Sequence, residues 1–425
     1  MNRTDFEAYY QKAAPIRVSR EVVERLKPLR VYGLKKEDII NHTDITSKQI
    51  REDLALFFEL LRYCYSGYSY YLEGKIEPEA KTEEILELLP DTAITTFALA
   101  DAVCQVLSPY INDSHFAFAS DHRTSFAKLF QAYFSDAVVC ACEGGYRVEN
   151  GSPQIPAGHL FSKEEAEAYL FETLPGEDGR RRYLLGVYTP EEASEITVGG
   201  IALPLHRCKT DSVCPNPQQG AAWEEERDGI PVVYHATYSA KDIALSFEDY
   251  RKSGMRYRDS DLLVWSLLSN TGGHSGYPQN FVLGLNGYAC WEMDVAMLSG
   301  PFTGKAEAQE IRYEVYENEK IDLSRSEYEG KLFVLQNKRV MSSGESALYF
   351  ARSVKHVTFV GSASGGCGQF GDIGIYRLPN TGLVFQMGYK VFNNENFEEG
   401  RGLLPDYWLD SSDPVGEVVR YLRSR

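Results

Sequence analysis

The chain has 425 residues, of which 43% are hydrophobic and 25% are charged. This length is sufficient for two or three domains with buried cores, and the composition excludes a chain that is disordered throughout. The formal net charge of −17 argues against a broad surface for nucleic acid or anionic membrane, because phosphate groups attract clustered Lys and Arg. No apolar run of about 18 or more residues occurs, so we expect no membrane-spanning segment.

The eight cysteines show no metal-binding spacing. None forms a C-x-x-C pair, and no His lies at zinc-finger distance from them. We therefore expect mostly reduced, buried thiols, with a few disulfides if the protein is exported, and neither a metal nor another cofactor. The N-terminal residues show no basic stretch followed by an apolar core, so no signal peptide is visible. Either the protein stays inside the cell or this is a mature exported chain.

The first predicted domain, residues 1–123, is helical. Apolar residues in 47–76 recur with a helical period, and 82–111 continues the pattern with Pro90 as a break. This region leads to the segment Asn-Asp-Ser-His at 112–115. Five tyrosines between residues 63 and 71 are more typical of packing against a neighbouring domain than of a sugar or peptide groove.

The second predicted domain, residues 124–230, is rich in β structure. Short apolar runs alternate there with Gly, Asn and Pro, which is typical of small β elements joined by turns. One helix is expected at 162–174, because Ser162 followed by Glu165 forms a capping box.

The third predicted domain, residues 231–425, alternates strands and helices, which indicates α/β layers. The segment 281–298 is mixed in pattern and is interpreted as a candidate helix. The expected strands lie at 231–239, 261–270, 331–337, 356–362 and 382–392, and the expected helices lie at 242–254 and 342–354.

The most informative pattern is a buried strand that leads into Ser342 and Ser343 at the start of a helix. The first backbone N–H groups of a helix are unpaired and favour negative charge. A serine there can attack a carbonyl while the next N–H binds the oxyanion. The alternative is a structural N-cap, completed by Glu345 or Ser346.

Two other segments supply matching chemistry. Gly272 and Gly273 follow a buried strand and permit a close approach of the backbone. His115 follows Ser114, and a histidine is the usual general base for a hydroxyl nucleophile. Taken alone, the glycine pair is more typical of an ordinary turn, and His115 is more typical of a surface or structural histidine. The competing histidines are His42, His122, His159, His206, His235, His274 and His356, of which His274, in the glycine loop, is the main rival.

In this order, the segments resemble the C-terminal-processing (tail-specific) serine peptidase family, and within it the tricorn-like branch. The resemblance covers about the last 190 residues well, together with the helical N-terminal region. Each motif is loose, but the five occur in the expected order. They are NDSH (112–115), NTGG (270–273), SSGE (342–345), VTFVG (357–361) and GRGLLPD (400–406).

The resemblance implies a fold and a set of roles. The fold is α/β (α+β), with a crotonase/ClpP-like spiral α/β core after a helical N-terminal region and a small β-rich insert similar to a degenerate PDZ module. A different β-rich insert fits that middle portion as well. Ser342 matches the nucleophile, and His115 matches the general base. Ser114 and Glu399 match the rest of a Ser-His-Ser-Glu tetrad. The N–H of Ser343 and that of Gly272 or Gly273 match the oxyanion hole.

The sequence also departs from the family. The other branch uses a Ser-Lys dyad with the lysine in a G-K-G element, but here the element is Gly366-Cys367-Gly368, so the dyad lysine is absent. The family's D-x-R strand end is replaced by Ser266-Leu267-Leu268. Without the resemblance, Glu399 would be interpreted as a solvated charge.

We therefore expect a serine endopeptidase that acts on peptides or unfolded protein and forms a covalent acyl-enzyme. One alternative is a catalytically inactive relative that binds peptides or cell-surface material. Another is a thiol enzyme that uses Cys367 with a histidine. The resemblance implies an extracytoplasmic or secreted location, with a cytoplasmic one as the alternative. The oligomeric state is open, and no nucleic-acid partner is expected.

Overall fold

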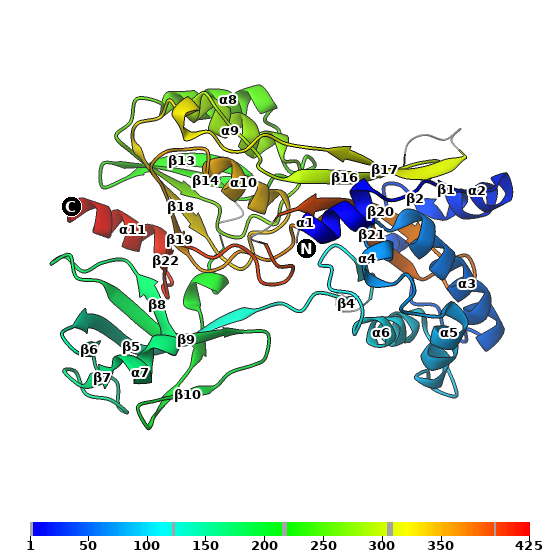
Figure 1. The fold of residues 1–425 in the computed structure, drawn as a ribbon, viewed down its shortest axis with the longest axis horizontal. Coiled ribbons are helices and arrows are strands. Elements are labelled where there is room, and N and C mark those ends of the chain that lie inside the picture. Colours follow the sequence, from blue (N-terminus) through cyan, green and yellow to red (C-terminus); the bar gives the residue numbers. More distant parts are fainter. Residues whose placement is uncertain (1–2, 121–123, 215–218, 304–308, 395–396) are drawn as a thin grey trace. The chain divides into compact units, whose positions relative to one another are not determined.

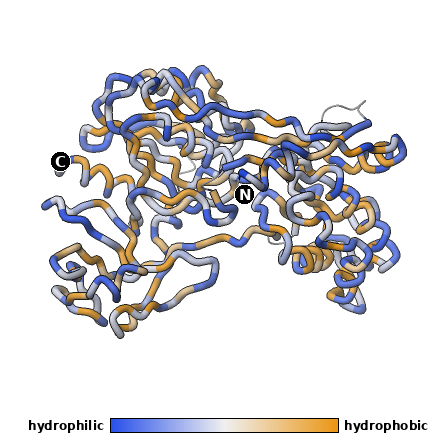
Figure 2. The backbone as a smooth tube through the Cα atoms, in the orientation of Figure 1, coloured by the Kyte–Doolittle hydropathy of each residue, from blue (hydrophilic) through white to orange (hydrophobic). Residues whose placement is uncertain are grey.

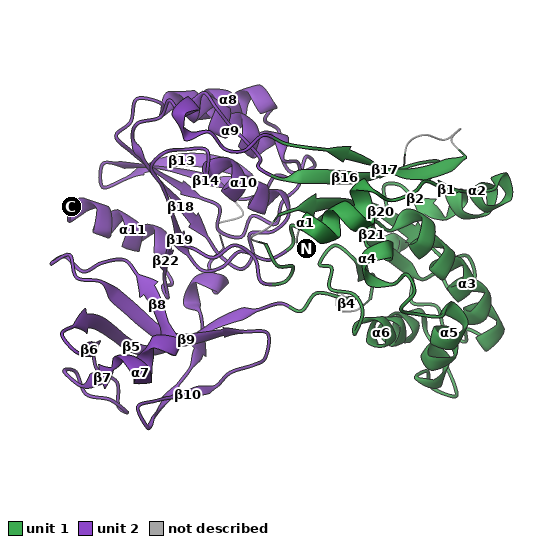
Figure 3. Cartoon of the chain, in the orientation of Figure 1, with its two compact units in different colours: residues 1–128, 293–318, 367–400 green, residues 129–292, 319–366, 401–425 purple. Residues whose placement is uncertain are grey.

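The computed structural model describes residues 3–120, 124–214, 219–303, 309–394 and 397–425. Within these ranges the chain forms two compact units, each built from discontinuous segments (Figure 3). Unit 1 comprises 1–128, 293–318 and 367–400, and unit 2 comprises 129–292, 319–366 and 401–425. The three-domain division of the sequence stays a prediction.

Unit 1 combines helices with one sheet whose strand pairings are all antiparallel (Figure 1). The sheet order is β1-β17-β16-β21-β20-β2, and β3 pairs with β21 and with β4. Its strands are β1 Ile16–Arg17, β2 Arg30–Val31, β3 Ala117–Phe118, β4 Thr124–Ser125, β16 Asp294–Ser299, β17 Glu310–Tyr316, β20 Phe370–Arg377 and β21 Val384–Asn393. Its helices are α1 Arg3–Phe6, α2 Arg20–Leu26, α3 Ser47–Cys64, α4 Tyr68–Tyr71, α5 Pro78–Glu87 and α6 Thr96–Leu107.

The helical prediction for the first domain is confirmed where it is most periodic. Helix α3 begins after a Thr46–Gln49 capping box and buries one apolar face, and the tube in Figure 2 alternates between orange and blue in this part of the chain. The expected break near Pro90 separates α5 from α6. The side chain of Phe57 in α3 packs against that of Phe385 in β21, with ring centroids 5.0 Å apart, so the helices and the sheet share one core.

Unit 2 contains a six-stranded sheet, β13-β14-β15-β18-β19-β22, in which every pairing after β13–β14 is parallel. Strands with such buried runs of Val, Leu and Phe need helices on their faces. This arrangement confirms the α/β class. The elements are β13 Ala222–Arg227, β14 Ile230–His235, β15 Leu262–Ser266, β18 Lys331–Gln336, β19 Val357–Gly361, β22 Tyr407–Trp408, α8 Phe247–Arg256, α9 Gly276–Asn286, α10 Ser343–Ala351 and α11 Pro414–Arg423.

Unit 2 also contains the β-rich portion, an antiparallel sheet of order β7-β6-β5-β9-β8 with β12 on β5, and a hairpin of β10 and β11. Phe134 of this sheet packs against Trp408 of the parallel sheet, with ring centroids 5.9 Å apart. The elements are β5 Gln131–Cys142, β6 Gly145–Asn150, β7 Leu160–Ser162, α7 Lys163–Ala166, β8 Leu170–Thr173, β9 Arg182–Thr189, β10 Glu195–Val198, β11 Ile201–Pro204 and β12 His206–Arg207.

Two sequence predictions need local correction. The capping box of Ser162 and Glu165 is present, but helix α7 ends at Ala166, and residues 170–173 form β8 instead. This segment pairs with β9, so the sheet overrides the helical start signal. The mixed segment 281–298 is helical only to Asn286, and after a connection at 287–293 it enters strand β16.

No disulfide joins any of the eight cysteines, all of which lie in the described part of the chain. Six are buried, Cys142 is half-buried and Cys214 is exposed, so the expectation of mostly buried thiols is confirmed. Among the described helices, none is both long and apolar enough to cross a bilayer.

A buried histidine in unit 2 should make the stability of the protein depend on pH. His235 is 1% exposed, and its Nδ1 accepts a hydrogen bond from Nε1 of Trp265 at 3.0 Å. Burial lowers the pKa of His235 to about 3. The unfolded chain, with an imidazole pKa near ~6.5, takes up this proton first as the pH falls. His235 therefore makes the free energy of unfolding decrease between pH ~6.5 and ~3.

We expect His235→Phe, which keeps a ring but cannot titrate, to reduce this pH dependence. Between pH 7 and pH 4.5 the wild-type protein should lose about 2–3 kcal/mol more stability than the variant, as measured by urea unfolding. Leaving the Nε1–H of Trp265 without an acceptor costs the variant the same free energy at every pH. Comparing how the stability of each protein changes with pH therefore cancels this cost. An equal slope in both proteins would contradict the buried neutral imidazole.

Candidate active site

The serine of the candidate site lies where two neighbouring parallel strands of unit 2 end. Strand β15 leads into the turn 270–273, and its neighbour β18 leads to Ser342. The carboxyl ends of parallel strands meet at one edge of a sheet, which is the usual position of ligand sites in open α/β sheets. The sequence motifs NTGG and SSGE are therefore brought together by strand pairing.

Ser342 is the N-cap residue of α10 and has a strained backbone. Its φ is +53° and its ψ is −120°, a conformation that L-residues rarely adopt. Its N–H donates to Oε2 of Glu345 at 3.1 Å. The side chain of Ser342 is half-buried, whereas the whole of α10 that follows is buried. The structural-cap interpretation and the nucleophile interpretation thus apply to the same residue.

Glu345 holds the surroundings of Ser342 in place. It is 1% exposed, and its Oε1 accepts from Oγ of Ser364 at 2.6 Å and from the N–H of Gly366 at 2.8 Å. A buried carboxylate needs such donors, because desolvation otherwise disfavours its charge. Glu345 therefore links the start of α10 to the loop after β19.

The glycine turn packs directly against the backbone of the candidate nucleophile. Gly272 has a φ of +96°, and a Cβ at this position would lie 2.8 Å from Cβ of Ser342 and 2.9 Å from N of Ser343. No side chain fits there, which explains the glycine physically. Oγ of Ser343 donates to the carbonyl of Gly273 at 2.9 Å and ties the helix to the turn.

The two glycines differ as oxyanion donors. The N–H of Gly272 donates to Oδ1 of Asn270 at 3.0 Å, so it is already engaged. Gly273 is exposed, and within the described residues its N–H has no acceptor. Asn270 is fully buried and also donates to the carbonyl of His235 at 2.9 Å. Sequence reasoning quoted Asn270 as part of a motif but did not recognise this role.

Three other candidate residues lie together in unit 1. The backbone N–H of Ser114 donates to Oε1 of Glu399 at 2.9 Å, and that of Gln369 donates to Oε2 at 2.9 Å. Glu399 is only 2% exposed, so it is not the solvated charge that its neighbours suggest. A ring nitrogen of His115 and a carboxylate oxygen of Glu399 lie within 4.8 Å of each other.

The turn that presents His115 is held by Asp113. Its Oδ1 accepts from the N–H of His115 at 2.7 Å and from that of Phe116 at 3.2 Å, and its Oδ2 accepts from the hydroxyl of Tyr65 at 2.9 Å. Burial raises the pKa of Asp113 to about 6. The carbonyl of His115 accepts from Nε2 of Gln386 in β21 at 3.1 Å. Tyr65 and Tyr71, two of the five tyrosines between residues 63 and 71, thus support this turn by packing and hydrogen bonding.

The rival histidine has a different environment. His274 is exposed in unit 2, and its Nδ1 accepts from the N–H of Gly276 at 3.0 Å. A neutral imidazole whose Nδ1 is an acceptor carries its proton on Nε2 and has no second lone pair for a serine hydroxyl. His122 lies outside the described residues.

Cys367, at the position of the family's dyad lysine, contacts His115. Its Sγ lies 3.3 Å from Nδ1 and 3.7 Å from Nε2 of the imidazole. Cys367 is 5% exposed and His115 is 9% exposed. The thiol-enzyme alternative paired Cys367 with a histidine without saying which one, and the contact identifies it as His115, 252 residues away in the sequence.

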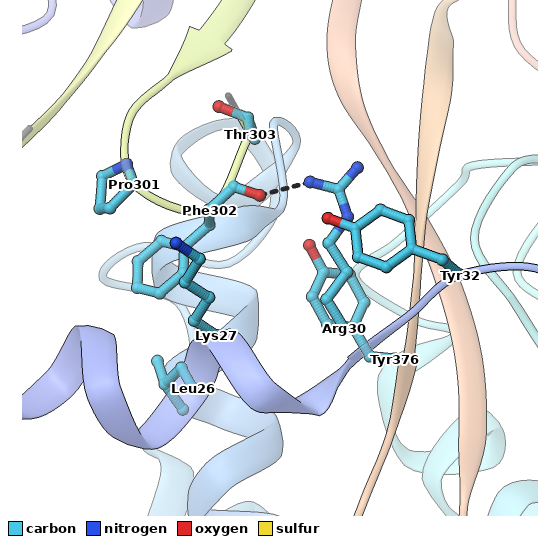
Figure 4. A pocket seen from close by; sticks show the side chains of 8 residues that line it. All are labelled: Leu26, Lys27, Arg30, Tyr32, Pro301, Phe302, Thr303 and Tyr376. Atoms are coloured by element: carbon cyan, nitrogen blue, oxygen red, sulfur yellow. Dashed lines mark hydrogen bonds between the residues drawn. The ribbon is translucent and has the colours of Figure 1, made fainter. Parts of the chain in front are cut away.

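A separate pocket of about 320 Å³ lies in unit 1 (Figure 4). The Arg30 side chain donates to the carbonyl of Phe302, and its guanidinium lies 5.2 Å from the ring centroid of Tyr32. None of the candidate catalytic residues lines this pocket.

The comparisons with known proteins match part of the chain to one peptidase family. Residues 291–409, which include Ser342 and Glu399, match the sequence model of peptidase family S41. The match defines the class as a serine-type peptidase, a hydrolase of peptide or protein substrates. The resemblance to the S41 peptidases, the family of the tail-specific and tricorn-like enzymes, is therefore confirmed for this part of the chain.

Several solved structures are similar to this chain at low sequence identity. A variant of CPAF is 13% identical with a TM-score of 0.50, covering 89% of this chain and 96% of that one. The photosystem II D1 C-terminal processing protease is 16% identical with a TM-score of 0.36, covering 86% of this chain and 94% of that one. The tricorn protease is 12% identical with a TM-score of 0.38, covering 89% of this chain and 37% of that one. No curated protein matches the chain.

Proposed function

We propose that this protein is an endopeptidase in which Ser342 attacks the scissile carbonyl. The observation that carries the proposal is the strained Ser342 backbone at the start of α10, with a side-chain-free glycine turn packed against it. Strain of this kind is characteristic of active sites and of serine nucleophiles on a strand-to-helix turn.

In the proposed reaction, Ser342 Oγ forms a bond to the carbonyl carbon while His115 takes the hydroxyl proton. The carbonyl oxygen becomes an oxyanion, which the N–H groups of Ser343 and Gly273 stabilise. Gly273 is assigned this role because the N–H of Gly272 already serves Asn270. Collapse of the intermediate breaks the C–N bond, and His115 returns its proton to the leaving amine. Water then releases the acyl group by the same steps.

Ser114 and Glu399 complete the proposed tetrad as positioning residues. Glu399 is buried and fixed by two backbone N–H groups, so its charge is held close to the segment that carries His115. A buried carboxylate in this position favours the imidazolium that forms during the reaction. The proposed link from Glu399 through the Ser114 hydroxyl to the imidazole follows the family resemblance.

A fluorophosphonate probe tests the proposal, because it reacts with an activated serine. We expect one adduct, located on Ser342 by peptide mass spectrometry, and none in Ser342→Ala. A protein that binds peptides but is not labelled would instead be the catalytically inactive relative. An adduct on a different serine would contradict the assignment of the nucleophile.

The thiol-enzyme alternative has one observation in its favour, the contact of Cys367 with His115. Against it, Cys367 is almost fully buried, whereas nucleophilic cysteines lie in partially exposed positions. Inhibition by iodoacetamide, together with insensitivity to the fluorophosphonate, would support the thiol enzyme and exclude the serine mechanism.

Two further parts of the proposal concern the middle domain and the location. The PDZ-like character of residues 124–230 stays a prediction, and peptide binding that is lost on deletion of this portion would support it. An extracytoplasmic location also stays a prediction. Recovery of the full-length protein only from the cytoplasmic fraction would contradict it.

A further inference from the structure

Unit 1 contains a compact group of three different metal-binding side chains. Donor atoms of the His115 imidazole, the Cys367 thiol and the Glu399 carboxylate all lie within 4.8 Å of one another. The proposed mechanism uses His115 and Glu399 but gives Cys367 no role. The chemistry of this trio differs from that of a lone cysteine or an acidic cluster, because it combines nitrogen, sulfur and oxygen donors.

Backbone N–H groups hold the carboxylate of Glu399 in place. Each oxygen of Glu399 accepts one backbone N–H, from Ser114 and from Gln369, at 2.9 Å. Hydrogen bonds of this kind are typical of carboxylates that bind metals, because they orient the ligand.

We propose that His115, Cys367 and Glu399 form a binding site for Zn²⁺. Thiolate, imidazole and carboxylate are the ligands that zinc uses in proteins, and a thiolate disfavours Mg²⁺ and Ca²⁺. One thiolate and one carboxylate balance the charge of a divalent cation, with a neutral imidazole as third ligand. Zinc–ligand distances of about 2.0–2.3 Å place neighbouring ligand atoms about 3–4 Å apart, so small side-chain movements suffice.

Zinc at this site would control the proposed peptidase, and this part of the inference rests on the proposed function. A zinc ion at this site binds the imidazole lone pair of His115, the general base. It also binds the carboxylate of Glu399, which supports that imidazole. The imidazole then cannot accept the proton of Ser342. Zinc binding and base catalysis therefore exclude one another, which predicts reversible inhibition.

Metal binding is tested without reference to activity, by titrating the full-length protein with Co²⁺ as a spectroscopic substitute for zinc. We expect one equivalent to give a cobalt–thiolate charge-transfer band in the near ultraviolet, which Zn²⁺ abolishes and Mg²⁺ does not. Cys367→Ser should lose the band, whereas Cys214→Ser, which alters an exposed thiol, should keep it. Absence of the band in the wild-type protein, or its persistence in Cys367→Ser, would overturn the site.

The regulatory consequence is tested by the rate of fluorophosphonate labelling at Ser342 with and without Zn²⁺. We expect zinc to slow labelling at least about tenfold in the wild-type protein and in Cys214→Ser, but not in Cys367→Ser. Equal slowing in Cys367→Ser would overturn the coupling. If the wild-type protein is never labelled, the proposed function fails, while the cobalt spectrum still decides the metal site.

Discussion

Replacement of Ser342 by alanine should lower peptide turnover at least about 10⁴-fold while the fold is retained. The expected loss is this large because the covalent route disappears, leaving only the oxyanion donors and substrate binding. The strained backbone and the bond from the Ser342 N–H to Glu345 do not depend on the hydroxyl. Loss of the N-cap side chain should therefore cost only about 1 kcal/mol of stability.

The measurement is kcat on a reporter peptide, together with the midpoint of thermal unfolding. Ser346→Ala is the matched control, because Ser346 lies on the same helix and its Oγ accepts a hydrogen bond from the hydroxyl of Ser275 at 3.1 Å. Its turnover should stay within about tenfold of the wild type. Turnover in Ser342→Ala close to that of the wild type would remove this serine from the mechanism.

Replacement of His115 by asparagine should lower kcat by about 10²–10⁴-fold, the usual contribution of a positioned general base. The variant should also lose the acidic limb of the pH–rate profile that the imidazole produces. The backbone N–H of residue 115 keeps its bond to Asp113, so the turn should survive the change.

His274→Asn is the control for this experiment, since His274 is the rival histidine and is exposed. Its Nδ1 accepts the N–H of Gly276, and we expect turnover near that of the wild type. The opposite result, a large loss of kcat in His274→Asn with little effect in His115→Asn, would show that His274 is the general base.

Much of the fold could be predicted because local patterns and strand pairing agree. The apolar runs that became β15, β18 and β19 lie in sequence order and pair in parallel, which places the NTGG and SSGE segments at one sheet edge. Residues 170–173 were misread as helix, because the capping signal at Ser162 is local and says nothing about the later pairing with β9.

The candidate site could be predicted residue by residue only where a motif fixes backbone geometry. Gly272 is a clear example, since its contacts leave no room for a side chain. Whether the N–H of Gly272 or that of Gly273 can bind the oxyanion depends on the position of the Asn270 side chain. That position is known only from the coordinates. The sequence suggested a histidine partner for Cys367 in the thiol-enzyme alternative, but only the coordinates show that the partner is His115.

The central claim is that Ser342 and His115 act as one catalytic unit, and a double-mutant cycle tests it most directly. When two residues act in the same catalytic step, replacing both lowers kcat by much less than the product of the two single losses. The account predicts that Ser342→Ala combined with His115→Asn has the same residual kcat as Ser342→Ala alone. A double variant that loses the product of the two single effects would show that the serine and the histidine work independently, and would contradict the account.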